Sequence, residues 1–379
     1  MIYSDIYQTL KTEFNKSDKV IRVDSLSLII KKLSFNSTWF NSNLIPPLEN
    51  DASIECNNSF DYFLFEKSDS PKSNEIILLF HGLNEKTWDK YLPWAYQLMQ
   101  QTGKSVLLFP IAFHMNRAPN IWSDPRKMKK ISLERSIIPS NLDSSYANAS
   151  LSSRIQSRPE RFYFSGLQTY FDVCGLIKSI KAGKIKELSP NSNIDLFGYS
   201  VGAFLSLLFL MDNPNGYFSK SRLFMFCGGS LVDRTFPVSK YILDKLAFNT
   251  LSTYLNDFIN DQRIVLRNIS NTIGGFLNGE SYFQSLISSN VFREMRETRL
   301  NQISERIGTL VLKNDNVIRP TEVVNTLKNK FDEVKSKFEI RDFDYAYNHV
   351  VPFPILDKYK LKVDTSFKSV FESASSFLV

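Results

Sequence analysis

The sequence predicts an α/β fold in which a mostly parallel central sheet is flanked by helices. From Glu75 onward, short apolar runs alternate with longer segments whose apolar residues recur at helical spacing. Runs that are apolar at nearly every position indicate strands buried on both faces, as in a parallel sheet covered by crossover helices. These two observations predict the fold class.

Six of the apolar runs are the candidate central strands. They occupy residues 76–80, 105–110, 194–197, 222–227, 309–312 and 338–343. Ahead of them, the segments SIEC (53–56) and FDYFLF (60–65), with the turn-forming residues 68–74, predict an antiparallel hairpin that feeds the edge of the sheet.

Three further intervals predict the domain organisation. Residues 1–50 mix helical and extended signals and are interpreted as an N-terminal extension, so that the core comprises 51–230 and 308–379. Residues 231–307 are too long for one crossover and contain two segments with apolar residues at helical spacing, which predicts a helical cap inserted between two strands. The alternative is that these helices only add to the core. Residues 115–161 are also too long for a simple connection.

The charge balance argues against a nucleic-acid-binding protein. The net charge is +7, but 46 basic residues are interspersed with 39 acidic ones, which predicts a mixed, solvated surface. The densest basic stretch, residues 126–135, is interpreted as a solvated loop rather than a nucleic-acid patch.

The cysteines and the apolar runs argue against a disulfide framework, a zinc site and a membrane span. The three cysteines lack paired spacing, so we expect reduced thiols and no metal. No apolar stretch approaches the roughly 20 residues of a membrane span, and the first residues lack a signal-peptide pattern. The expected location is therefore the cytoplasm.

The stretch GYSVG (198–202) carries the candidate nucleophile, Ser200. It lies where an apolar strand ending at Phe197 gives way to a helix beginning at Val201, which is the strand, tight turn and helix context that a GxSxG nucleophile requires. Glycines before and after the serine allow strand and helix to approach closely. The alternative is a packing pair of glycines with an incidental serine.

A serine hydroxyl needs a base, and histidine suits neutral pH best. Of the three histidines, His349 lies after the last predicted strand and fits the chain order nucleophile, acid, histidine. His114 is the alternative base, and His81 is expected to brace the loop after the first central strand.

The imidazole needs a carboxylate to fix its tautomer, and Asp315 is the candidate because it follows a predicted strand at the carboxyl edge of the sheet. Asp233, after another strand, is the runner-up, and a carboxylate that only satisfies backbone donors is the alternative role for Asp315. The backbone N–H groups of Leu83 and Val201 are the candidate oxyanion donors. The alternative for residues 81–82 is an ordinary strand-ending turn.

Four segments together resemble the α/β-hydrolase superfamily, over roughly residue 60 to the C-terminus: in chain order they are FHGLNE (80–85), GYSVG (198–202), KNDNVIRP (313–320) and NHVVPFP (348–354). The resemblance implies an eight-stranded, mostly parallel sheet, a Ser, Asp, His triad and a cap that enters after the sixth strand. The N-terminal extension and the 115–161 interval depart from that pattern.

The expected function is hydrolysis of a small-molecule carboxylic ester or thioester through an acyl-enzyme on Ser200, with no metal or organic cofactor. Alternatives are an inactive member that binds a ligand or partner, an acyltransferase and an amidase. The sequence does not identify the substrate-binding residues. Five phenylalanines of the predicted cap either line an acyl site or form the cap core: Phe236, Phe248, Phe258, Phe276 and Phe283. Five polar or aromatic residues that follow strand ends are candidates for the border of the pocket: Trp88, His114, Asn116, Arg117 and Trp122.

Overall fold

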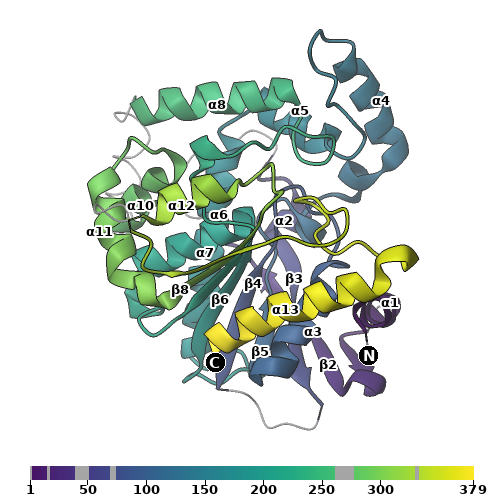
Figure 1. Cartoon of the computed structure of the whole chain (residues 1–379), viewed down its shortest axis with the longest axis vertical. Helices are drawn as coiled ribbons and strands as arrows, with labels where there is room; N and C mark the ends of the chain where they lie inside the picture. The colour runs from purple at the N-terminus through teal and green to yellow at the C-terminus, as the bar shows by residue number, and fades with distance from the viewer. Residues whose placement is uncertain (1, 15–17, 39–50, 69–73, 261–276, 329–332) are drawn as a thin grey trace.

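A single mixed sheet forms the centre of the molecule (Figure 1). The structure, a computed structural model, describes residues 2–14, 18–38, 51–68, 74–260, 277–328 and 333–379. Within these ranges the sheet has nine strands in the order β1-β2-β3-β5-β4-β6-β7-β8-β9. The strands are β1 (Val20–Val23), β2 (Leu28–Asn36), β3 (Ser59–Lys67), β4 (Glu75–Phe80), β5 (Ser105–Leu108), β6 (Asn193–Tyr199), β7 (Leu223–Phe226), β8 (Ile307–Leu312) and β9 (Lys337–Arg341).

The predicted fold class is confirmed. Neighbouring strands run parallel throughout the part of the sheet ordered β5-β4-β6-β7-β8-β9. Of these, β4, β5, β6, β7 and β8 are buried along most of their lengths, as expected from their apolar runs. All six candidate central strands are present, with ends that differ by up to two residues from the prediction.

The predicted hairpin is wrong. The segment 53–56 is not a strand, because Glu55–Asn58 form the short helix α2, whose buried Asn57 donates to the Gln168 side chain. Strand β3 pairs antiparallel with β2 on one side and with β5 on the other. Neither partner of β3 is the segment 53–56 that the prediction assigned to it.

The N-terminal region contributes directly to this edge, so the predicted boundary at residue 50 does not follow the sheet. Strand β2 pairs with β3 from Leu28 opposite Lys67 to Asn36 opposite Ser59, and β1 pairs with β2. Leu28 and Ile30 of β2 are buried, whereas its second half is partly or fully exposed, so its apolar signal is weaker than that of the central strands. Helix α1 (Tyr3–Phe14) is anchored by the Tyr3 amide, which donates to Asp364 Oδ1 at 2.7 Å.

Helices cover both faces of the sheet, and each face has its own hydrophobic core (Figure 1). One core joins the sheet to α1, α3 (Tyr91–Thr102) and α13 (Lys360–Leu378). The other joins it to α6 (Arg161–Lys181), α7 (Val201–Asp212), α10 (Leu277–Ile287), α11 (Arg293–Ile303) and α12 (Pro320–Leu327). Single 3-10 turns occur at Asp24–Leu26, Met115–Arg117, Asn120–Ser123, Pro214–Gly216, Val232–Arg234, Ser304–Arg306 and Asp357–Tyr359.

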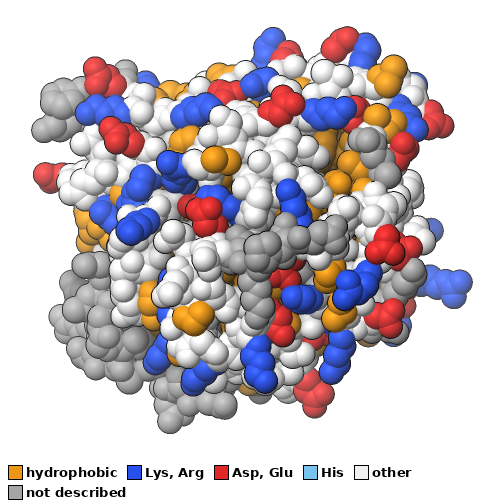
Figure 2. Space-filling view, turned by 90° about the horizontal axis from the view of Figure 1, so that it is seen from below, with side chains coloured by type: hydrophobic (Ala, Val, Ile, Leu, Met, Phe, Trp, Pro, Cys, Tyr) orange, Lys and Arg blue, Asp and Glu red, His pale blue; other side chains and the backbone are white. Residues whose placement is uncertain are grey.

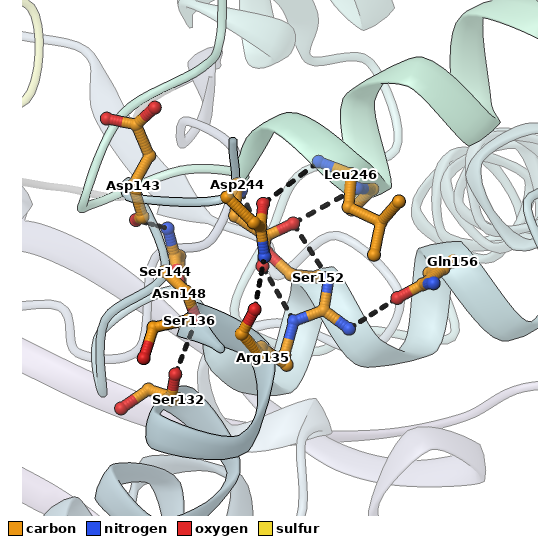
Figure 3. A network of polar contacts seen from close by, with 12 residues as sticks. Ser132, Arg135, Ser136, Asp143, Ser144, Asn148, Ser152, Gln156, Asp244 and Leu246 are labelled. Carbon is orange, nitrogen blue, oxygen red and sulfur yellow. Dashed lines mark hydrogen bonds and ion pairs between the residues drawn. The ribbon is translucent and has the colours of Figure 1, made fainter. Parts of the chain in front are cut away.

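Three more helices, α4 (Pro125–Ser136), α5 (Ala149–Ser157) and α8 (Lys245–Asn260), form a layer at the top of Figure 1, which we name the α4–α5–α8 layer. The Arg135 guanidinium of α4 donates twice to the buried carboxylate of Asp244, which precedes α8 (Figure 3). The Asp244 amide in turn donates to Ser152 of α5. The two long intervals of the sequence are thus joined to each other.

The basic stretch 126–135 is helical, so its interpretation as a loop is wrong. Asp124 caps α4 by accepting hydrogen bonds from the amides of Arg126 and Lys127, and Pro125 occupies the first turn. Its charged residues outnumber its apolar ones, which obscured the helical period in the sequence.

The face opposite the α4–α5–α8 layer carries Lys and Arg side chains interspersed with Asp and Glu (Figure 2). This is the mixed surface that the charge balance predicts. Among the described helices, none is both long enough and apolar enough to cross a bilayer.

Candidate active site

Ser200 lies at the sharp turn between β6 and α7, with φ 55° and ψ −122°. This is a backbone conformation that a residue with a side chain rarely adopts, and strain of this kind is characteristic of functional sites. A Cβ on Gly198 would lie 2.4 Å from the Ala203 Cα, and one on Gly202 would lie 2.4 Å from the Phe80 carbonyl oxygen. The two glycines therefore let the turn pack directly against α7 and β4.

Three predicted site residues are joined by hydrogen bonds. His349 Nε2 lies 2.8 Å from Ser200 Oγ, and His349 Nδ1 lies 2.7 Å from Asp315 Oδ2. All three residues are buried, with exposed fractions of 7% for Ser200, 5% for His349 and 2% for Asp315. Because a carboxylate only accepts hydrogen bonds, Nδ1 carries the proton of the neutral ring, and Nε2 accepts from the serine hydroxyl.

Asp315 makes backbone contacts as well. Its Oδ1 accepts from the amides of Val317 and Ile318, both at 2.9 Å, while Oδ2 faces the imidazole. These bonds fix the carboxylate in the orientation that meets His349. The runner-up, Asp233, uses its Oδ2 to accept from the amide and the hydroxyl of Ser289.

The other two histidines brace the loops after β4 and β5. Burial lowers the pKa of His81 well below its ordinary value, and the neutral ring accepts from the Ile111 amide and donates to the Gly82 carbonyl. Burial lowers the pKa of His114 to about 4, and its Nδ1 donates to the Ala112 carbonyl. Their hydrogen bonds are to backbone groups rather than to Ser200.

The amides of Leu83 and Val201 have the freedom that an oxyanion site needs. Both residues line the same cavity as Ser200, and within the described ranges neither amide donates to a protein acceptor. The neighbouring Gly82 amide is already bonded to Tyr91 Oη, which itself donates to Glu85 Oε1. The bend of the loop after β4 is thus held by α3.

Sequence reasoning missed Lys90, which connects the loops around the site. Its ammonium pairs with Glu85, donates to the Val350 carbonyl at 3.1 Å and lies 4.6 Å from the centre of the Tyr199 ring. The Tyr199 hydroxyl donates to the His349 carbonyl, and burial raises the pKa of Tyr199 well above its ordinary value, which keeps this donor protonated. No local pattern in the sequence marks these contacts, because the partners are remote in the chain.

A cavity of about 160 Å³ opens beside Ser200. Side chains from the loops after β4, β6, β7 and β8 form one side of it, and α8 forms the other. The lining residues are Leu83, Phe162, Ser200, Val201, Phe204, Ser230, Val232, Asp233, Thr235, Pro237, Ile242, Leu243, Phe248, Leu251, Ser252, Leu255, Asn256, Val317 and Ile318. Most of these side chains are apolar.

Of the five phenylalanines considered from the sequence, Phe248 lines this cavity. Phe236 stacks on the Arg319 guanidinium, and Phe283 is buried against Tyr163 and Phe204. Phe276 and the side chain of Phe258 lie outside the described part of the structure.

The five candidate border residues lie away from the cavity lining. Arg117 is fully buried and paired with Asp172, and Trp88 donates to Asn116. His114 and Trp122 line a separate cavity of about 20 Å³.

The three cysteines are unpaired, and burial raises the pKa of Cys227 well above its ordinary value. Across the residues that the structure describes, no group of three or more His, Cys, Asp or Glu side chains is arranged to hold a metal ion.

A family model matches residues 1–379, the whole of the sequence, and its description is a family of unknown function, DUF6051. The chain belongs to this family. No curated protein shows significant sequence similarity to this member of DUF6051.

Several solved structures are similar to this DUF6051 protein at low identity. Carboxyl esterase 2 from the mycorrhizal fungus Tuber melanosporum is 12% identical, with a TM-score of 0.47, over 96% of this chain and 90% of that one. Esterase Est22 is 12% identical, with a TM-score of 0.48, over 94% and 83%. The Pyrococcus furiosus esterase Pf2001 is 12% identical, with a TM-score of 0.43, over 94% and 93%.

Proposed function

We propose that this protein is a serine hydrolase that cleaves a carboxylic ester or thioester. The observation that supports it is the continuous hydrogen-bond chain from Asp315 through His349 to Ser200, at the wall of an apolar cavity. A nucleophile, a base and a carboxylate that orients the base are the parts that acyl transfer requires.

The reaction follows from this geometry. Ser200 Oγ attacks the substrate carbonyl carbon while its proton moves to His349 Nε2, and Asp315 stabilises the imidazolium. The amides of Leu83 and Val201 donate to the oxyanion. The C–O or C–S bond then breaks, the leaving alcohol or thiol takes the proton from Nε2, and the acyl group stays on Ser200. Water then attacks the acyl carbon while its proton moves to the same nitrogen. The bond between the acyl carbon and Ser200 Oγ breaks, Oγ takes the proton back from Nε2, and the acid leaves.

The cavity indicates an apolar acyl group. Phe204, Leu251 and Leu255 are among the side chains that line it, and transfer of an acyl chain from water onto such a surface is favourable. The helix α8 supplies part of this wall, so we propose that residues 231–307 act as the cap over the site.

A fluorophosphonate probe and an ester panel test the proposal. The protein should be labelled at Ser200 and should hydrolyse esters, whereas Ser200→Ala should lose labelling and roughly 10⁴-fold or more of kcat. Ser206→Ala is the matched control, because Ser206 is also buried on α7 but donates to the Gly202 carbonyl. Equal rates in the wild-type protein and Ser200→Ala would remove Ser200 from the mechanism.

The alternatives predict different products with the same protein. A protein that only binds a ligand would not be labelled. An acyltransferase would transfer the acyl group to an added alcohol in preference to water, and an amidase would favour amides over the matching esters.

A further inference from the structure

The end of α4 and the loop after it expose an unusual group of apolar side chains, which we name the apolar tip: Leu133, Ile137, Ile138, Leu142 and Tyr146. Ile137 is 80% exposed and Leu142 is 79% exposed. Single exposed apolar residues are ordinary on protein surfaces, but a group of them on one projecting segment indicates an interaction surface.

The apolar tip is a folded structure. The Asn141 side chain donates to the Arg135 carbonyl, and Ser144 Oγ donates to the Ser132 carbonyl, so the loop returns against the end of α4. Figure 3 shows the contact between Ser144 and Ser132 near the Arg135–Asp244 pair. In Figure 1, α4 and its loop project at the upper right, away from the sheet.

The preceding turns of α4 carry a basic cluster, Arg126, Lys127, Lys129 and Lys130, all exposed. Within the described ranges none of these four cations forms an ion pair. Lys129, Leu133 and Ile137 recur at intervals of four residues, so basic and apolar side chains share one exposed face of the segment. The only acidic residue within α4 is Glu134.

This combination fits an anionic lipid surface. Lysines and arginines are attracted to anionic headgroups. The free energy of neighbouring leucine and isoleucine side chains falls when they leave water for the boundary between headgroups and acyl chains. A second copy of the chain fits less well, because a two-fold contact at this surface would bring two basic clusters together. We propose that α4 and its loop dock on an anionic phospholipid surface.

The proposed surface lies close to the cavity. The Asn84 side chain donates to the carbonyls of Ala147 and Tyr241, at 2.9 and 2.7 Å, and so ties the loop after the apolar tip to the loop that carries Leu83. Leu83 lines the cavity beside Ser200. Docking would therefore hold the substrate cavity near the lipid. The docking itself does not depend on the proposed hydrolase activity.

Co-sedimentation of the full chain with vesicles tests the proposal. The protein should bind vesicles that contain phosphatidylglycerol, bind phosphatidylcholine vesicles much more weakly, and dissociate as salt is added. Lys127→Glu/Lys130→Glu should lower the partition coefficient at least about 20-fold. Ile137→Ser/Leu142→Ser should lower it about tenfold.

Two matched controls carry the same chemical changes elsewhere. Lys178→Glu/Lys220→Glu makes the same charge change near the amino edge of the sheet, and Leu356→Ser/Leu361→Ser removes two exposed apolar side chains beside and on α13. Both controls, and Ser200→Ala, should bind as the wild-type protein does. Hydrolysis of a short water-soluble ester should be unchanged in the two α4 variants, so loss of docking and loss of catalysis are distinguishable.

Three results would overturn the proposal. One is equal vesicle binding by the α4 variants and their controls, or no binding by the wild-type protein. The second is a concentration-dependent dimer that the α4 variants abolish, without vesicle binding, which would assign the surface to a second copy. The third is binding of a DNA or RNA oligonucleotide that needs Lys127 and Lys130 but not Ile137 and Leu142, without vesicle binding.

Discussion

The loops around Ser200 and the α4–α5–α8 layer are both joined by buried polar contacts, but the contacts differ in what they hold. Around Ser200, hydrogen bonds connect loops that each follow a strand, so the side chains are fixed relative to the sheet. In the layer, the Arg135–Asp244 pair connects helices to one another, and α5 and α8 add apolar residues to one core of the sheet. The reacting atoms are therefore positioned by contacts between loops of the sheet, whereas the cavity takes its walls from both regions, since these loops and α8 line it together.

Apart from Ser200→Ala, the largest expected effect on kcat concerns the acid of the proposed triad. Asp315→Asn should lower kcat about 10³-fold, because the amide favours the wrong imidazole tautomer and does not stabilise the imidazolium. The measurement is steady-state hydrolysis of a short ester.

Asp233→Asn is the matched control, since Asp233 also lines the cavity but bonds Ser289 rather than His349. Its kcat should change by less than about threefold. The reverse ranking of the two variants would move the acid to the loop after β7.

The second effect tests the α4–α5–α8 layer. Asp244 is fully buried, and although burial alone would raise its pKa, hydrogen bonds from Arg135 and the Ala247 amide lower it. Arg135→Met would leave this carboxylate without its cation, which should lower the free energy of unfolding by about 3 kcal/mol. The free energy of unfolding is measured by urea denaturation. Steady-state kinetics with an ester that has an apolar acyl chain is the second measurement, and KM should rise by a larger factor than kcat falls.

Arg126→Met on the exposed side of the same helix is the control and should change stability by less than about 0.5 kcal/mol. In the double variant Arg135→Met/Asp244→Leu, part of the stability should return, because the unpaired charge is gone. Equal stability of the Arg135 and Arg126 variants would show that the pair does not hold the layer.

A smaller effect is expected for Lys90, as a positioning residue that touches no substrate. Lys90→Met removes the link between Glu85, the Val350 carbonyl and the Tyr199 ring, so kcat should fall about tenfold while KM changes little. Lys90→Arg should restore part of the loss. Lys86→Met is the control, because Lys86 belongs to the same loop but donates to Ala147. A change in KM with an unchanged kcat would contradict the positioning role.

The parts that the sequence predicted are those with local signals. The central strands were predicted because they are apolar along nearly their whole length, which reflects their burial. The turn at Ser200 was predicted from the two glycines that flank the serine, and the structure gives their reason: a Cβ at either position would collide with backbone atoms within or beside the turn. The predicted roles of Ser200, Asp315 and His349 stay predictions, although the structure brings the three side chains together.

The parts that the sequence did not predict depend on remote partners. Strand β1 is the edge of the sheet and β2 is its neighbour; both are partly exposed, and β2 is in turn paired with β3, so their apolar signal was incomplete. The buried residues of helix α4 are Met128, Ser132 and Arg135, so only one of them is apolar. The contacts of Lys90 reach Glu85, Val350 and Tyr199, which belong to three different segments. No local period or motif encodes such contacts.

The last effect is a dependence of stability on pH at α10, which packs against α7. Glu280 accepts a hydrogen bond from Tyr163 of α6, and burial raises the pKa of Glu280 to about 7. The folded protein therefore holds this proton at pH values where the unfolded chain has lost it. The contribution of Glu280 to the free energy of unfolding is fully present below about pH 4.5. It falls by about 1–3 kcal/mol as pH rises toward about 7, and is then level.

The variant Glu280→Gln keeps a hydrogen-bonding partner for Tyr163 but does not ionise. It should flatten this part of the stability profile, measured by urea denaturation between pH 5 and 8. Since Glu280 is not in the hydrogen-bond chain of Ser200, its removal should leave the pH profile of kcat unchanged; a shift in that profile would mean that α10 and the site are coupled, and that the two regions are not independent.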